Sequence, residues 1–283
     1  MNKLWIIFVL IYGLLKGTRE GMKKAALKKS SSIEILFFYT LIGFILTIPY
    51  LNVAIKLAPI HIFWAFVKAG VCCTAWIFSL KAIKAMSVSL YGIMDLSRMI
   101  FSTLLGIFVL GESLTFYKVT GMLLVLTGLF LVNLKKGTNA KGLTIYSLAA
   151  ALLCCFFNAI SGTMDKILMQ HMTSKQLQFW FMFFMALIYG VIIIIRKEKI
   201  SFSTLRTNYW VPLMSISLVL GDLLLFEANA NPESQVTVMT VIKQSSVIVT
   251  VLTGWLVFKE KNILYKLMCT LIILSGIFVA LLS

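Results

Sequence analysis

Long apolar runs alternate with short polar breaks along the whole chain, and this pattern predicts membrane-spanning helices. A helix needs about 20 residues to cross the hydrocarbon core of a bilayer. Runs of that length predict an all-α integral membrane protein with ten transmembrane helices and no soluble domain. The predicted segments are residues 4–22, 33–54, 60–80, 87–110, 114–134, 143–165, 176–195, 209–229, 235–258 and 262–282.

The second half of the chain resembles the first half. Residues 87–134 align with residues 235–282 without a gap, and about 14 of the 48 positions are identical. The polar matches carry the argument, because apolar residues recur by chance in any membrane protein. They include Glu112 with Glu260, Tyr117 with Tyr265 and Lys118 with Lys266. We expect Glu112 and Glu260 to lie in turns, with little part in transport.

This duplication predicts two five-helix repeats, residues 1–137 and 138–283. The first helices of the repeats match weakly, since residues 17–20 (GTRE) resemble residues 162–165 (GTMD). Because five is odd, the second copy enters the membrane inverted relative to the first. A cavity is then expected between the two halves.

The first predicted helix has two further features. Lys16, Arg19 and Glu20 follow its apolar run too soon for a cleaved signal peptide, so we expect a retained helix. Gly13, Gly17 and Gly21 are spaced by four and share one face. Such a row predicts either tight packing against another helix or a pliable gating helix.

Composition agrees with a lipid environment. The chain is 60% hydrophobic and only 13% charged, with a mean hydropathy of +0.97. A soluble domain is nearer a quarter charged. The net charge of +16 lies in short gaps between apolar runs rather than in a basic arm, so nucleic-acid binding is not expected.

Motifs for metal, cofactor or enzyme chemistry are missing from the sequence. The five cysteines form no CxxC pair, and the chain has two histidines without a partner at metal-ligand spacing. The sequence contains no HExxH, GxSxG or phosphate-binding GxxxxGK[ST] motif. We therefore expect no metal, no cofactor and no enzyme activity, and any transport would draw on ion or substrate gradients.

Loop charges predict an orientation. The gaps after the odd-numbered segments carry most of the lysines and arginines, whereas the opposite gaps have little beyond Lys3, Lys56, Lys118 and Lys175. Because basic loops stay in the cytoplasm, both termini are predicted outside.

Several stretches resemble the EamA-type branch of the drug/metabolite transporter superfamily. They are residues 78–89 (FSLKAIKAMSVS), 110–115 (LGESLT), 121–128, 226–230 (FEANA) and 258–262 (FKEKN). The resemblance spans essentially the whole chain and implies a multi-pass transporter of the cell membrane, such as a bacterial inner membrane. It also implies cytoplasmic termini and a basic stretch after the second helix. Here that gap, residues 51–59, holds only Lys56, so the orientation stays open.

Five charged residues lie near the middle of predicted membrane segments, where an unpaired charge costs several kcal/mol. They are Lys68, Asp95, Arg98, Asp222 and Lys243. Asp95 and Arg98 are three residues apart and can be neighbours. Asp95 aligns with Lys243, and the two could form an ion pair at mid-membrane. Such a pair would serve either as a structural lock or as a substrate or proton site.

Other candidates rank below these five. Asp222 is the best single candidate for a proton-carrying carboxylate, and Glu227 lies five residues beyond it, nearer the end of the helix. Glu20 and Asp165 are expected closer to the membrane surfaces. Three aromatic residues could line the cavity, although core packing is the simpler explanation: Tyr12, Tyr91 and Trp76.

These observations favour a secondary transporter that exports a small polar metabolite by alternating access in exchange for protons. Three basic and two acidic central groups favour a substrate with a carboxylate or phosphate, such as an amino acid. The alternatives are an uptake carrier, a substrate-exchange antiporter, or a membrane receptor or scaffold without transport activity. The expected partners are a small solute, protons and the lipid bilayer, and the sequence leaves the oligomeric state open.

Overall fold

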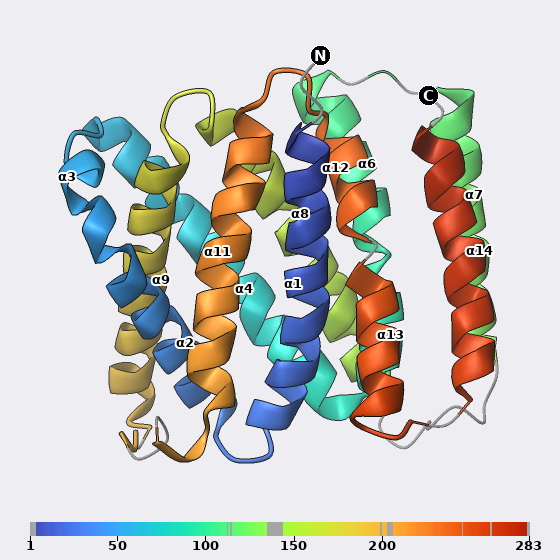
Figure 1. Cartoon of the computed structure of the whole chain (residues 1–283), viewed down its shortest axis with the longest axis horizontal. Helices are drawn as coiled ribbons and strands as arrows, with labels where there is room; N and C mark the ends of the chain where they lie inside the picture. Colours follow the sequence, from blue (N-terminus) through green and yellow to red (C-terminus); the bar gives the residue numbers. More distant parts are fainter. Residues whose placement is uncertain are drawn as a thin grey trace.

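The described part of the chain is built from helices (Figure 1). A computed structural model describes residues 4–111, 113, 115–134, 144–198, 200–202, 206–244, 246–260 and 262–281. The first half contains α1 (Leu4–Ala26), α2 (Ser32–Thr47), η1 (Ile48–Tyr50), α3 (Leu51–Ala54), α4 (Pro59–Ala85), α5 (Val88–Asp95), α6 (Arg98–Leu110) and α7 (Phe116–Leu134). The second half contains α8 (Ile145–Leu168), α9 (Ser174–Arg196), α11 (Trp210–Ala230), α12 (Val236–Lys243), α13 (Ser246–Leu256) and α14 (Ile263–Leu281). The predicted boundary between repeats, at 137/138, lies outside the described residues.

Helices occupy all ten predicted segments, and six helical stretches in the described chain are long and apolar enough to cross a membrane. They are Ser32–Ala54, Pro59–Ala85, Val88–Leu110, Ile145–Leu168, Ser174–Arg196 and Trp210–Ala230. The other four segments contain shorter apolar helices or, in α1, several charges. Three of the charged residues of α1, Lys16, Arg19 and Glu20, are buried.

Side chains at the helix starts satisfy backbone N–H groups that have no partner within the helix. Ser31 accepts a hydrogen bond from the backbone N–H of Glu34 at the start of α2. Thr144 with Ser147, and Thr173 with Gln176, form reciprocal capping boxes at α8 and α9. These polar residues fix where each apolar run becomes a helix.

Two of the predicted segments are each split into a pair of shorter helices. Residues 87–110 form α5 and α6, with the break at Leu96 and Ser97. Residues 235–258 form α12 and α13, and α12 ends at Lys243. The two breaks fall at aligned positions of the repeats, since Asp95 corresponds to Lys243.

The packing partners follow the repeat. Helix α4 packs against α8 and α1 against α11, while α6 packs against α8 and α13 against α1. In the repeat, α1 corresponds to α8, α4 to α11 and α6 to α13. The α4–α8 contact therefore corresponds to the α11–α1 contact, and the α6–α8 contact to the α13–α1 contact. Helices α7 and α14 are counterparts and pack against each other at one side of the molecule (Figure 1). Their contact is close, because a Cβ on Gly128 would lie 2.3 Å from Ile273 and one on Gly276 would lie 2.6 Å from Leu124.

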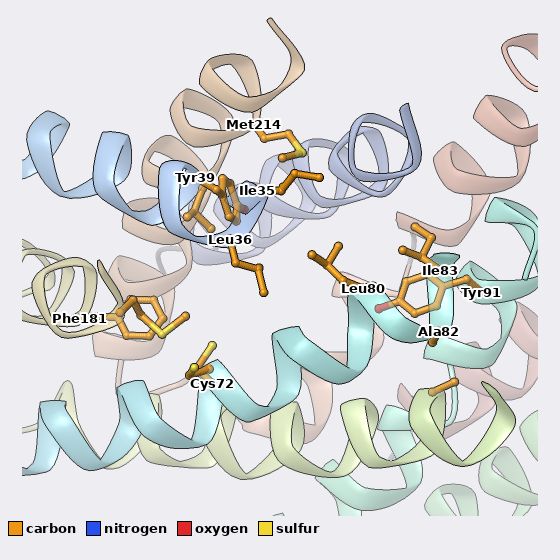
Figure 2. Packing of buried hydrophobic residues seen from close by; sticks show 14 of the residues in the cluster. Ile35, Leu36, Tyr39, Cys72, Leu80, Ala82, Ile83, Tyr91, Phe181 and Met214 are labelled. Carbon is orange, nitrogen blue, oxygen red and sulfur yellow. The ribbon is translucent and has the colours of Figure 1, made fainter. Parts of the chain in front are cut away.

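The buried apolar core joins the two halves. Figure 2 shows side chains from α2, α4, α5, α9 and α11 converging around α4. They include Tyr39, Cys72, Tyr91 and Phe181, whose polar atoms or rings also reach the cavity described below. The core therefore forms one wall of that cavity.

Both chain ends lie at one edge of the molecule (Figure 1). The connections between α1 and α2 and between α13 and α14 lie at the opposite edge. The α1–α2 connection, which carries Lys28 and Lys29, thus lies at the edge away from the termini.

Candidate functional site

The first helix has an apolar outer face and a charged inner face. Leu4, Ile7, Ile11 and Leu14 are exposed, as expected for side chains that contact lipid. On the other face, buried side chains recur every three or four residues, the spacing that places residues on one side of a helix. They are Tyr12, Lys16, Arg19 and Glu20, followed by the partly buried Lys23.

The first charged cluster forms at the break between α5 and α6. The carboxylate of Asp95 accepts a hydrogen bond from the ammonium of Lys16 and another, 2.7 Å long, from Nη2 of Arg98. The side-chain amide of Gln244, at the aligned break, donates to the backbone oxygen of Asp95 over 3.3 Å. One carboxylate therefore holds two cations, and the interrupted helix gives Asp95 and Arg98 room to face each other.

The charged residues of the second cluster lie on α1, α4, α8 and α11. Lys68 Nζ is 3.1 Å from Asp165 Oδ1 and lies 3.5 Å from the centre of the Phe181 ring. Arg19 Nη1 is 3.9 Å from Asp222 Oδ1, at the outer limit of an ion pair. Asp222 is thus more loosely held than the other buried carboxylates of the site.

Lys243, at the last turn of α12, is also buried, with 8% of its surface exposed. No ion pair or hydrogen bond links its ammonium to any residue in the described ranges. It is the repeat counterpart of Asp95, yet the two do not form an ion pair.

A polar cavity of about 80 Å³ lies among these groups. Six basic and three acidic side chains line it: Lys16, Arg19, Lys23, Lys68, Arg98 and Lys243, with Glu20, Asp165 and Asp222. Helices of both halves contribute, α1, α4 and α6 from the first and α8, α11 and α12 from the second. The volume is small beside the roughly 300–1,000 Å³ of pockets for drug-sized ligands, so this conformation admits water or a compact solute.

At the edge away from the termini, a carboxylate links the two halves outside the cavity. Glu260, between α13 and α14, accepts a 2.8 Å hydrogen bond from the backbone N–H of Val88, at the start of α5. Lys266 Nζ lies 2.7 Å from its other oxygen. Burial disfavours ionisation of Glu260, but the hydrogen bonds from Lys266 and Ser89 outweigh it and lower the pKa of the carboxyl below its usual value. The turn position predicted for Glu260 is confirmed, and Glu112 lies outside the described residues.

Each half of the chain matches the same family model, described as the EamA-like transporter family, over residues 3–134 and 145–282. This protein belongs to the EamA-like transporter family. Members of this family are non-enzymatic transporters, so the chain is a multi-pass membrane transporter. No curated protein matches the sequence.

The fold of this EamA-like transporter is also found among solved structures. One of them, titled only "Crystal structure of protein", has a TM-score of 0.73 and 14% sequence identity. The match covers 100% of this chain and 98% of that chain. At this identity the likeness concerns the fold alone.

The structure of this EamA-like transporter brings most of the predicted site residues together. Nine of them line the cavity directly: Lys68, Arg98, Asp222, Lys243, Tyr12, Tyr91, Trp76, Glu20 and Asp165. Asp95 is not in the lining but forms ion pairs with Lys16 and Arg98, which are. Glu20 and Asp165 are 6% and 5% exposed and belong to the cavity wall.

Two expectations differ from the structure. Glu227 is exposed, accepts a hydrogen bond from Ser174 and is absent from the cavity lining. Asp95 pairs with Lys16 and Arg98 instead of Lys243, because α1 packs against both α5 and α12. Lys16, the lysine that pairs with Asp95, lies on α1. The alignment of the two breaks gave no indication that this helix would be adjacent.

The sequence reading also missed Lys16, Arg19, Lys23 and Tyr39 as cavity residues. Three of these are on α1. Lys16 and Arg19 were expected only to mark the end of an apolar run, and Lys23 to lie in the gap after the first helix. Their signal was the three- and four-residue spacing from Tyr12 to Lys23, which places them on one helix face.

Proposed function

We propose that this EamA-like transporter is a secondary carrier that moves a small, acid-bearing polar metabolite across the cell membrane by alternating access, coupled to protons. The observation that carries the proposal is the buried, charge-lined cavity, to which both halves contribute. Charges buried at membrane depth are typical of substrate and ion pathways. Export is the direction that we propose.

An inverted repeat supports alternating access. The packing partners exchange when each helix is replaced by its counterpart, and five helical segments per half make the copies antiparallel. In carriers of this kind, interrupted helices at corresponding positions border the substrate site. Here the breaks that follow Asp95 and Lys243 lie beside the cavity.

The charge of the cavity supports an anionic or zwitterionic substrate. Its six basic side chains outnumber the three acidic ones, and Asp95 behind them adds one further negative charge. A plain organic cation would meet net repulsion, whereas a carboxylate or phosphate would be attracted.

Asp222 is the carboxylate proposed to carry the coupling proton. It lines the cavity, and its contact with Arg19 is 3.9 Å, longer than the contacts that Asp95 and Asp165 make. A loosely held carboxylate can exchange its proton at a smaller cost in broken interactions than a doubly paired one.

Proteoliposomes with an imposed pH gradient test this proposal, with labelled amino acids and small organic acids as substrates. Replacing Asp222→Asn should abolish net flux driven by the gradient and leave substrate exchange without a gradient in place. Glu227→Gln is the matched control, because Glu227 lies on the same helix but outside the cavity. Gradient-driven flux that is unchanged in the Asp222 variant would refute the coupling, and absence of any flux in the unaltered protein would refute the carrier.

A further inference from the structure

Lys243 is the one cation in the cavity lining that forms no ion pair within 4 Å in the described part of the chain, and the carboxylates of Asp165 and Asp95 act on it only from a greater distance. Lys16 and Arg98 share Asp95, Lys68 faces Asp165, Lys23 contacts Glu20 and Arg19 lies near Asp222. Lys243 is more than nine-tenths buried and lines the cavity. An ammonium group at membrane depth is costly without a counter-ion, so this position favours an anion from outside the chain.

The repeat shows how the two halves differ at this point. In the first half, the carboxylate of Asp95 lies between Lys16 and Arg98. The corresponding positions around Lys243 are Ser161 and Ser246, as the aligned stretches place them. The sign of the central charge is reversed and the residues at the two aligned positions are uncharged, so the second half does not reproduce the ion pairs that Asp95 makes.

The same neighbours suit a carboxylate ligand. Ser161 lines the same cavity as Lys243, and a serine hydroxyl can donate a hydrogen bond to a carboxylate oxygen. The cavity of about 80 Å³ limits the bound part of the ligand to a few atoms. Phe181 and Trp76 add ring surfaces to the same wall.

We propose that Lys243 is the binding residue for the carboxylate of the transported solute, a small organic acid or zwitterionic amino acid. This inference rests on the proposed carrier function and names its substrate class. The bound carboxylate forms an ion pair with Lys243 in the second half. In the first half, the corresponding ion pairs are made within the chain, by Asp95 with Lys16 and Arg98.

Thermal unfolding of the detergent-solubilised full chain tests the assignment. The probes are sodium acetate, L-lactate, succinate and L-alanine, each compared with its amide, which keeps the shape and removes the carboxylate. At least one acid should raise the Tm of the unaltered protein while its amide does not. Lys243→Met should lower the affinity for that acid by about 10- to 100-fold, the loss expected when one hydrogen bond to a charged group is removed. Lys56→Met, at an exposed site away from the cavity, should leave the affinity unchanged.

A second measurement separates binding from a structural role. Without ligand, Lys243→Met should melt at or above the temperature of the unaltered protein, because it removes a buried charge without a partner. Lys68→Met should instead melt lower, because it leaves Asp165 without its cation. A lower ligand-free Tm for Lys243→Met, an unchanged acid affinity in that variant, or no response of the unaltered protein to any acid would each overturn the assignment.

These results are distinguishable from failure of the carrier proposal. Acid binding that depends on Lys243 in a protein that moves no solute would uphold this inference and refute the carrier. Proton-driven flux in a protein whose acid affinity is unchanged by Lys243→Met would uphold the carrier and refute this inference.

Discussion

At the scale of single residues, the buried carboxylates have different partners and therefore different tasks. Asp95 is held by two cations, Asp165 by one and Asp222 by a distant one. Glu260 is satisfied by a helix start and by Lys266, outside the membrane-spanning helices. This last group links the two halves at an edge of the molecule.

Replacing Glu260→Gln should destabilise the protein at neutral pH by about 1.5–3 kcal/mol, the usual contribution of hydrogen bonds to a charged group. The folded-state pKa of Glu260 is lowered, so its contribution is complete above its ordinary pKa of about 4.3 and is lost as the pH falls through the lowered value. Unfolding of the two proteins between pH 7 and pH 3 measures the difference in stability. That difference should be constant at higher pH and shrink in acid; a difference that grows in acid would contradict the assigned hydrogen bonds.

At the scale of helices, close contact between neighbouring helices decides which glycines leave no room for a larger side chain. A Cβ on Gly17 would lie 2.6 Å from the backbone oxygen of Ser246 and 2.7 Å from Cβ of Val249. Its counterpart Gly162 has no atom within 4 Å of that position. Gly17 therefore packs closely against α13, which agrees with the first of the two interpretations given to the glycine row.

We expect Gly17→Ala to cost about 1–3 kcal/mol, because a backbone atom cannot move aside as a side chain can. Gly162→Ala is the matched control and should be neutral or stabilising, since alanine is the better helix former by about 1 kcal/mol. Thermal unfolding in detergent measures both variants. Equal losses would show that α1 and α13 are not in close contact.

The positions of the helices can be predicted from the sequence, whereas the breaks within two of the segments cannot. Apolar run length placed helices in all ten predicted segments, because membrane thickness fixes the length of each run. It did not predict the breaks at Leu96–Ser97 and after Lys243, where neither proline nor glycine interrupts the run. There the polar side chains face partners on other helices, such as Lys16 on α1, and a single sequence does not tell which helix is adjacent.

At the scale of the whole molecule, both termini lie at one edge and the α1–α2 connection, with Lys28 and Lys29, at the other (Figure 1). Loop charge predicts that the lysine-rich edge is cytoplasmic, whereas the family resemblance implied cytoplasmic termini. The two predicted orientations are opposite, and the fold is compatible with either.

Single cysteines and a membrane-impermeant maleimide decide between them. By loop charge, Glu233→Cys, between α11 and α12, should react in intact cells, and Lys28→Cys, between α1 and α2, only after permeabilisation. The five native cysteines are buried, so they provide an unreactive background. The opposite pattern would place the termini in the cytoplasm.

The charged inner face of α1 has an electrical consequence. This helix presents Lys16, Arg19 and Lys23 to the cavity against the single negative charge of Glu20. Carrying one elementary charge across a membrane potential of 100 mV involves about 2.3 kcal/mol of work. Any step that shifts α1 along the membrane normal therefore moves net positive charge through the field. The resting voltage of the cell then favours one end of that movement over the other.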